Sequence, residues 1–267
     1  MGNKYCISID LEGLACVVGS YGQGLTEGSK NYQFAIGQAV REANAAAKAL
    51  FDSGAEKVVI WDCHGTGVNL DYSAFDKRCE FIIGAGSRLR FPGIDESFSG
   101  VLFIGYHAYD TPKATLAHTY SSSTFTYHKI NGKDIGELQL DAAIAGKRGV
   151  KTIFVCSDDI CVAQAKETFP WIKSVTTKTP LAWNSCISKH PLAVCDEIYE
   201  AVLDAVKELD SMKTYEIPTP FELTVSYKRI EYAQGCSLRN PDNTPFEFVD
   251  AYTRRGVLED PEHYFQF

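Results

Sequence analysis

Residues 6–13 read Cys6-Ile7-Ser8-Ile9-Asp10-Leu11-Glu12-Gly13, an apolar run that passes directly into two acidic side chains. Because side chains alternate between the two faces of a strand, Asp10 and Glu12 are expected to point the same way. Farther along, apolar residues from about Tyr32 to Phe51 recur at the spacing of one helical face, and Gly54 follows as a stop signal. A strand, a helix and a second strand form the opening unit of an α/β fold.

Two later apolar runs also end in residues that bind metals. The run 58–62 is followed closely by His64, and the run 101–106 is followed by His107. In a parallel sheet the carboxyl ends of the strands share one edge, and open α/β proteins bind their ligands there. We therefore expect these two histidines to meet the two acidic residues of the first strand in a metal site.

The rest of the chain continues the alternation of strands and helices. Asn131-Gly132 is a strong signal for a hairpin turn, and a helix is expected just after it, from Gly136 to about Lys147. The elements expected next are a strand at 152–156, a helix at 159–168, a strand near Val175 and a helix at about 191–209. This order favours a three-layer α/β fold with a mostly parallel, doubly wound sheet over residues 1–213.

The character of the sequence changes after Lys213. Pro218 and Pro220 interrupt the chain, and residues 222–230 alternate like an edge strand. The last segment is rich in polar and aromatic residues. We expect residues 214–267 to form a small C-terminal α+β unit packed on the larger domain.

Composition narrows the range of functions. The chain has 267 residues, of which 45% are hydrophobic, and a net charge of −8; it is typical of a globular protein with one large core. The sequence lacks a cluster of lysine or arginine, so we expect neither nucleic acid nor an anionic membrane as a partner. A small substrate that carries an amine suits this charge. The nine cysteines contain no C-x-x-C pair, which argues against a disulfide framework or a thiolate zinc site.

The sequence also bears on location. Its apolar runs are much shorter than the ~20 residues that span a bilayer. The chain enters a strand almost at its start and shows no signal-peptide pattern there. We expect a cytoplasmic protein.

Each candidate ligand has an ordinary alternative when it is considered alone. An Asp at the end of a strand can cap the next turn, and a His there can hydrogen-bond the backbone. Several charged residues at the ends of central strands, however, are rare without an ion or a partner. A set of carboxylates and imidazoles without thiolates suits zinc, manganese or cobalt, and it leaves coordination positions open for water, as in a catalytic site.

Two further residues are candidates for the same site. Glu137 stands at the start of the helix after the hairpin, where a helix amino terminus also favours a negative charge for structural reasons alone. His118 lies in a polar loop beside hydroxyl side chains. Such an imidazole is either an acid–base group or a surface histidine.

These segments resemble the zinc D-aminopeptidases of bacterial dipeptide-transport operons. The resemblance covers roughly residues 4 to 210 in unbroken order, and it departs from the family mainly in the loop 84–98 and in the tail after Pro220. The matching pieces are Ser8-Ile9-Asp10-Leu11-Glu12-Gly13, Asp62-Cys63-His64 with Asn69-Leu70, Gly105-Tyr106-His107-Ala108, Ala117-His118 and Gly136-Glu137-Leu138.

The resemblance implies a specific assignment of the site. The ligands of two zinc ions would be Asp10, as the bridge, together with Glu12, His64, His107 and Glu137. His118 would be the catalytic histidine, either as a nucleophile, as an acid–base group or as a group that stabilises an oxyanion. The resemblance also implies a closed homo-oligomer, with a decamer as the family's form.

The resulting hypothesis is a dinuclear zinc aminopeptidase that acts on small peptides, in particular those with amino-terminal D-residues such as D-alanyl peptides. Mn²⁺ or Co²⁺ suits the same donors. One alternative is another metal-dependent amidase or deacylase on the same scaffold, and a second is a non-catalytic binder of small peptides.

Overall fold

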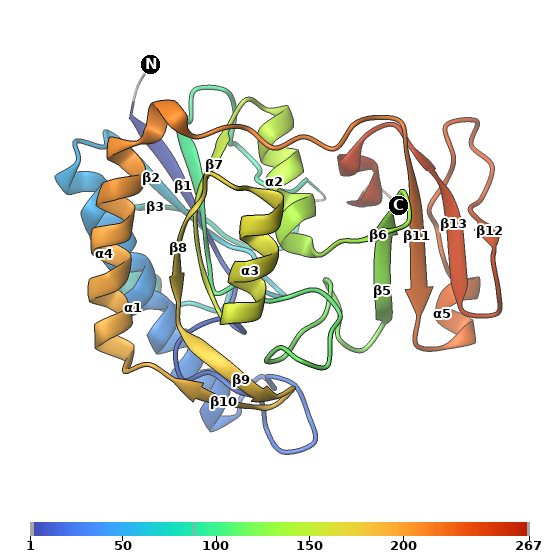
Figure 1. Ribbon diagram of the computed structural model, residues 1–267, viewed down its shortest axis with the longest axis horizontal. Coiled ribbons are helices and arrows are strands. Elements are labelled where there is room, and N and C mark those ends of the chain that lie inside the picture. The colour runs from blue at the N-terminus through green and yellow to red at the C-terminus, as the bar shows by residue number, and fades with distance from the viewer. Residues whose placement is uncertain (1–2, 88, 266–267) are drawn as a thin grey trace.

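A six-stranded parallel sheet forms the centre of the computed structural model, which describes residues 3–87 and 89–265 (Figure 1). The strands follow the order β3-β2-β1-β4-β7-β8 across the sheet. The chain therefore moves from β1 to β2 and β3 on one side and then crosses back to β4 on the other side of β1. The strand bounds are β1 (Lys4–Ile9), β2 (Lys57–Asp62), β3 (Glu80–Ile82), β4 (Gly100–Ile104), β7 (Lys151–Ser157) and β8 (Lys173–Thr176).

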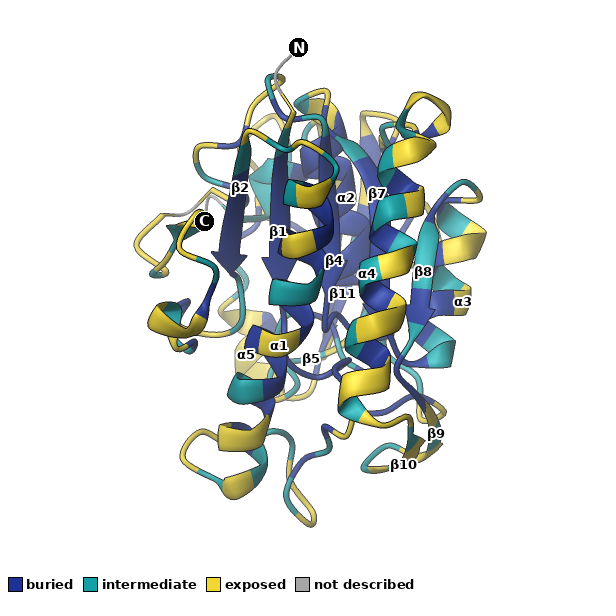
Figure 2. Ribbon diagram, turned by 90° about the vertical axis from the view of Figure 1, so that its left-hand side faces the viewer, coloured by how far each residue is buried: buried dark blue, intermediate teal, exposed yellow. Residues whose placement is uncertain are grey.

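Helices cover both faces of this sheet. The helices α1 (Lys30–Asp52) and α4 (Pro191–Lys207) pack on one face, and Figure 2 shows them in front of the sheet with their exposed sides turned outward. The helices α2 (Glu137–Lys147) and α3 (Asp159–Thr168) pack on the other face. Side chains of β1 alternate between the two faces of the sheet. Ile7 and Ile9 belong to the core under α1 and α4, and Cys6 belongs to the core under α2 and α3. The predicted three-layer, doubly wound α/β fold is confirmed.

A second, antiparallel sheet has the strand order β12-β13-β11-β5-β6. Its strands are β5 (Phe125–Ile130), β6 (Lys133–Asp134), β11 (Phe221–Tyr227), β12 (Glu247–Phe248) and β13 (Thr253–Leu258). The hairpin β5–β6 turns at Asn131 and Gly132, whose φ angles of 49° and 78° are those of the turn that the sequence predicted. The hairpin thus shares a sheet with strands from the C-terminal part of the chain.

The interpretation of residues 222–230 as an edge strand is wrong. The strand β11 pairs with β13 on one side and with β5 on the other, so it lies inside the antiparallel sheet. Its alternation arises because one face of the sheet packs on a core that includes Leu223 and Val225, while Glu222 on the other face is exposed. A one-sided sheet produces this pattern in central strands as well as in edge strands.

The helix α2 lies between the two sheets, as Figure 1 shows. Leu138 and Ala142 belong to the core under the parallel sheet, whereas Leu140 and Ala143 belong to the core of the antiparallel sheet. All residues from 137 to 146 are buried. A helix enclosed by two layers has no side that faces water, so its polar residues Glu137, Gln139 and Asp141 are buried along with its apolar ones.

The remaining elements are short. A hairpin that sequence reasoning did not predict, β9 (Lys178–Ala182) and β10 (Ser185–Ser188), leads from β8 toward α4. The helix α5 (Ile230–Gln234) packs on β11. Three 3₁₀ helices span Tyr72–Ala74, Leu209–Ser211 and Pro261–Phe265. Among the described residues, none of the helices has the length and apolar character needed to cross a bilayer.

Candidate active site

The candidate ligands come together at the carboxyl edge of the parallel sheet, where the strand order reverses between β1 and β4. Ile9 at the end of β1 pairs with Asp62 of β2 on one side and with Ile104 of β4 on the other. The loops that follow these strands therefore begin at the same level. Reversal points of this kind are where open α/β sheets bind ligands.

Glycine allows the loops after β1 and β4 to approach each other. The backbone of Gly105 has a φ of +77°, and a Cβ atom there would lie 2.1 Å from the carbonyl oxygen of Asp10. A Cβ atom on Gly13 would lie 1.9 Å from the carbonyl oxygen of Tyr106. Side chains at either position would push the acidic loop away from the loop that carries His107.

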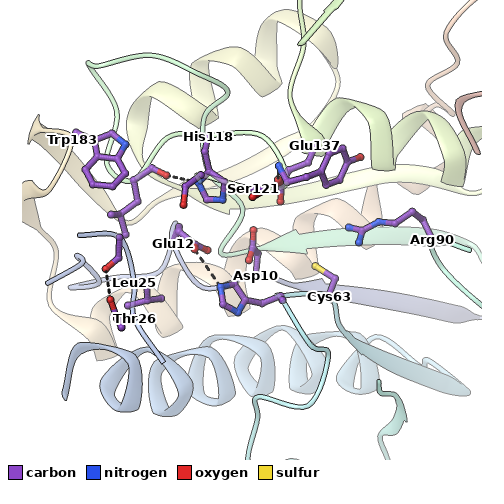
Figure 3. Close-up of a pocket in the computed structure, with 16 residues that line it drawn as sticks. Asp10, Glu12, Leu25, Thr26, Cys63, Arg90, His118, Ser121, Glu137 and Trp183 are labelled. Atoms are coloured by element: carbon purple, nitrogen blue, oxygen red, sulfur yellow. Dashed lines mark hydrogen bonds and ion pairs between the residues drawn. The ribbon is translucent and has the colours of Figure 1, made fainter. Parts of the chain in front are cut away.

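Each of the five candidate ligands lies within a few ångströms of at least one other. Nε2 of His107 is 3.4 Å from Oδ2 of Asp10 and 3.5 Å from Oε1 of Glu137. On the other side of the cluster, Nε2 of His64 is 3.3 Å from Oε1 of Glu12. Ligand-type atoms of Asp10, Glu12 and His107 all lie within 4.8 Å of one another. Figure 3 shows Asp10 and Glu12 facing the same cavity, with Glu137 nearby.

Three carboxylates are buried in this cluster, since Asp10, Glu12 and Glu137 are only 3%, 5% and 6% exposed. Burial, together with the charges of Glu12 and Glu137, raises the pKa of Asp10 well above its usual value. Burial also raises the pKa values of Glu12 and Glu137. The neighbouring imidazoles outweigh it, so His64 holds the pKa of Glu12, and His107 that of Glu137, below the usual range. Such a concentration of buried negative charge requires compensation by cations.

The donor atoms of the cluster fit a metal. Among the described residues, Oε2 of Glu12, Nδ1 of His64 and Nε2 of His107 are buried without a hydrogen-bond partner. Buried polar atoms are rarely left unpaired unless a ligand, ion or water satisfies them. Carboxylate oxygens and imidazole nitrogens are the donor set of catalytic zinc sites.

His118 joins the cluster from the loop that follows β4. Its ring stacks on that of His107, with centroids 4.0 Å apart. Ligand-type atoms of His107, His118 and Glu137 also lie within 4.8 Å of one another. Nδ1 of His118 lies 2.7 Å from the carbonyl oxygen of Leu116. Because a carbonyl oxygen can only accept a hydrogen bond, Nδ1 of His118 carries the proton. In the neutral ring Nε2 then keeps its lone pair.

The cluster opens into a cavity of about 530 Å³. Trp183, Leu25 and Thr26 lie on one side of the cluster, and Arg90 and Cys63 lie on the other (Figure 3). This volume falls within the range of about 300–1,000 Å³ typical of sites for small molecules.

Known proteins resemble this chain over most of its length. Residues 4–265 match the model of a peptidase family described as D-aminopeptidase. The chain belongs to this family. The resemblance noted in the sequence is thereby confirmed, and the protein is placed among the aminopeptidases.

One relative and one solved structure show how similar this D-aminopeptidase family member is to known proteins. A D-aminopeptidase from Bacillus subtilis (strain 168) is 25% identical over 236 residues, which cover 88% of this chain and 85% of the relative. The solved structure of the Zn-dependent D-aminopeptidase DppA from Bacillus subtilis, described as a self-compartmentalizing protease, has a TM-score of 0.89. It is 24% identical and covers 98% of this chain and 94% of the other. This likeness shows that the two proteins share a fold.

Sequence reasoning gave no role to several residues that shape the site of this family member. Lys178 is 1% exposed, and its Nζ donates to the carbonyl oxygens of Glu12, Leu14 and Val17 at 2.5, 3.0 and 2.7 Å. It thereby fixes the loop that carries Glu12. Trp183 reaches the cavity from the turn between β9 and β10. Neither residue has a local sequence signal, because each acts on a segment more than 60 residues away.

Proposed function

We propose that this protein is a dinuclear zinc aminopeptidase that hydrolyses small peptides with amino-terminal D-residues. The observation that carries the proposal is the buried cluster of three carboxylates around His64 and His107, which leaves donor atoms unpaired. Family membership supports the peptidase activity and the preference for D-residues. The similar fold of DppA, which is described as Zn-dependent, supports the choice of zinc.

In this proposal Asp10 would be the ligand that the two metal positions share. It belongs to one group with Glu12 and His107, and its Oδ2 is 3.4 Å from Nε2 of His107. Glu12 and His64 would hold one ion, and His107 and Glu137 would hold the other. Mn²⁺ or Co²⁺ would accept the same mixture of oxygen and nitrogen donors. Two such ions would supply water activation near neutral pH and polarise the scissile carbonyl.

His118 is the proposed catalytic histidine. The carbonyl of Leu116 fixes its proton on Nδ1, so Nε2 can accept a proton from the attacking water and return it to the leaving amine. Burial, and then the neighbouring His107, lower the pKa of His118, which keeps its ring neutral at neutral pH. A neutral ring suits an acid–base group.

Other residues of the chain keep the ligands in position. Nδ1 of His107 lies 3.1 Å from the carbonyl oxygen of Ala108, which orients Nε2 toward the carboxylates. Asn69 donates to the carbonyl oxygen of His64, and the carboxylate of Asp62 accepts from the backbone and side chain of Asn69 at 2.7 and 2.8 Å. The backbone N–H of Tyr120 donates to Oε2 of Glu137.

We further propose that the protein works as a closed homo-oligomer, with a decamer as the expected size. The similarity in fold to DppA, which is described as self-compartmentalizing, supports this assembly. Sedimentation velocity of the purified protein would report the number of subunits. A monomer at all concentrations would contradict the proposal.

The decisive experiment compares D-alanyl-D-alanine with L-alanyl-L-alanine as substrates, before and after chelation and after zinc is restored. We expect the D-peptide to be preferred, activity to disappear with chelation, and about two zinc ions per subunit to return with activity. Hydrolysis that survives complete removal of metal would refute the proposal. N-Acetyl-D-alanyl-D-alanine serves as a control, because an amidase or deacylase tolerates a blocked amine and an aminopeptidase does not.

A further inference from the structure

Arg90 is held rigidly in the wall of the cavity. Its Nε and Nη2 donate to Oδ1 and Oδ2 of Asp141 at 2.9 and 2.5 Å. Its Cζ lies 4.4 Å from the ring centroid of Trp61 and 5.5 Å from those of Tyr120 and Phe265. The Arg90 side chain is 16% exposed and the Asp141 side chain is fully buried. A guanidinium fixed on one edge by a carboxylate and on its faces by rings is pre-organised for recognition.

A short hydrogen-bonded chain connects Arg90 to the candidate ligands. The hydroxyl of Tyr106 donates to Oδ2 of Asp141 at 2.7 Å, and Tyr106 directly precedes His107. The thiol of Cys63 donates to the hydroxyl of Tyr106 at 3.3 Å, and Cys63 directly precedes His64. The position of the guanidinium is therefore tied to that of both histidines.

The charge of Arg90 sets it apart in this cavity. It lines the same cavity as Asp10 and Glu137, and among the described lining residues it alone is a lysine or an arginine. Within the described part of the chain, Nη1 of Arg90 forms no hydrogen bond, while Nε and Nη2 are engaged with Asp141. Figure 3 shows the guanidinium directed toward the centre of the cavity, beyond Cys63. The cavity thus offers a fixed cationic donor at one end and carboxylates with imidazoles at its centre.

We propose that Arg90 binds the C-terminal carboxylate of the substrate and so selects dipeptides with a free carboxyl end. This inference rests on the proposed function, in which the amino end of the peptide lies at the carboxylate and imidazole cluster. A carboxylate is the planar anion that guanidinium donors match best. The close connection through Asp141 and Tyr106 places the anchor near the cluster, which suits a peptide of two residues.

The first test uses the wild-type, zinc-loaded protein with two substrates that differ only at the C-terminus. These are D-alanyl-D-alanine and D-alanyl-D-alaninamide, with release of the amino-terminal D-alanine as the readout. We expect kcat/KM to be about 10- to 100-fold higher for the free acid, mainly through KM, as for a hydrogen bond to a charged group. Equal kcat/KM values would overturn the inference and leave the proposed function intact. Failure to cleave either peptide would instead count against the proposed function.

The second test separates binding from a purely structural role. Arg90→Gln alone would leave Asp141 buried without a cation, so the informative variant combines Arg90→Gln with Asp141→Asn. We expect the ratio of kcat/KM for acid over amide to fall to near one in the double variant. An equal loss on both substrates, with the ratio preserved, would show that Arg90 serves only the fold.

Arg148→Gln is the matched control. Arg148 also pairs with a carboxylate, that of Glu262, and its Nη1 donates to the carbonyl oxygens of Phe91 and Ile94 in the loop that carries Arg90. It does not line the described cavity. We expect this variant to lose stability but to keep the preference for the free acid. If Arg148→Gln erased the preference to the same extent, the effect would belong to the loop and the inference would fall.

Discussion

The imidazole rings of His107 and His118 stack with an interplanar angle of 17° and a centroid separation of 4.0 Å. Their pKa values are nevertheless shifted in opposite directions. Burial opposes protonation of His107, but the charges of Glu137 and Asp10 outweigh it and raise its pKa. For His118, burial and the charge of His107 both lower the pKa. In the proposed function the two adjacent rings would have different tasks: His107 would hold a metal beside the carboxylates, and His118 would act as a neutral base.

The difference between the two rings predicts the effect of His118→Ala. We expect this variant to keep its zinc and to lose turnover by about 10²-fold or more, the usual scale for one acid–base group. Metal content and kcat, measured on the same preparation, check this expectation. Because atoms of His118 also lie within 4.8 Å of His107 and Glu137, loss of zinc would instead make His118 a ligand.

Asp10→Asn tests the bridging position. A bridging carboxylate serves two ions, so we expect the variant to lose both ions and its activity while its circular dichroism spectrum remains that of the wild type. Asp52→Asn, which changes a surface carboxylate paired with Lys48, is the control and should retain both. Full activity of the Asp10 variant would exclude this residue as a bridge.

Metal binding should release protons. Burial opposes protonation of His64, but the charge of Glu12 raises the pKa of its imidazole to about 10, and the pKa of His107 is raised as well. In the metal-free protein both rings therefore hold protons at neutral pH, and an incoming ion must displace them. Zinc affinity should therefore rise with pH up to about 10, where the metal-free His64 loses its proton. Calorimetric titrations in buffers of different ionisation enthalpy would measure the release, and an unchanged heat across buffers would contradict it.

Lys178→Met should weaken both the fold and the site. The substitution preserves the volume of the side chain but leaves the carbonyl oxygens of Glu12, Leu14 and Val17 without their donor. We expect the free energy of unfolding of the metal-free protein to fall by about 3 kcal/mol or more, together with weaker zinc binding. Urea denaturation and zinc titration check the two effects. Lys189→Met removes an exposed pair with Glu197 and should cost less than about 1 kcal/mol.

The sequence predicts residues whose placement depends on local pattern. Asp10, His64 and His107 follow apolar runs, and parallel strands bring their own ends to one edge, so the approach of these side chains requires no further information. The hairpin at Asn131-Gly132 is predictable for the same reason, because the turn chemistry is contained in two adjacent residues.

The features that the sequence does not predict depend on distant partners. Arg90 and Asp141 are 51 residues apart, and Lys178 and Glu12 are 166 residues apart. The strand β11 looks like an edge strand because its neighbour β5 is drawn from much earlier in the chain. Periodicity records which face of an element is buried, but it does not record which element covers it.

Because α2 is enclosed between the two sheets, the position of Glu137 depends on the packing of both. The residue stands at the first turn of a helix whose next turns contact both cores, so the position of its carboxylate depends on packing that is remote from the cavity. Substitutions in the antiparallel sheet that shift α2 would therefore move the carboxylate of Glu137, even though they lie far from the cavity.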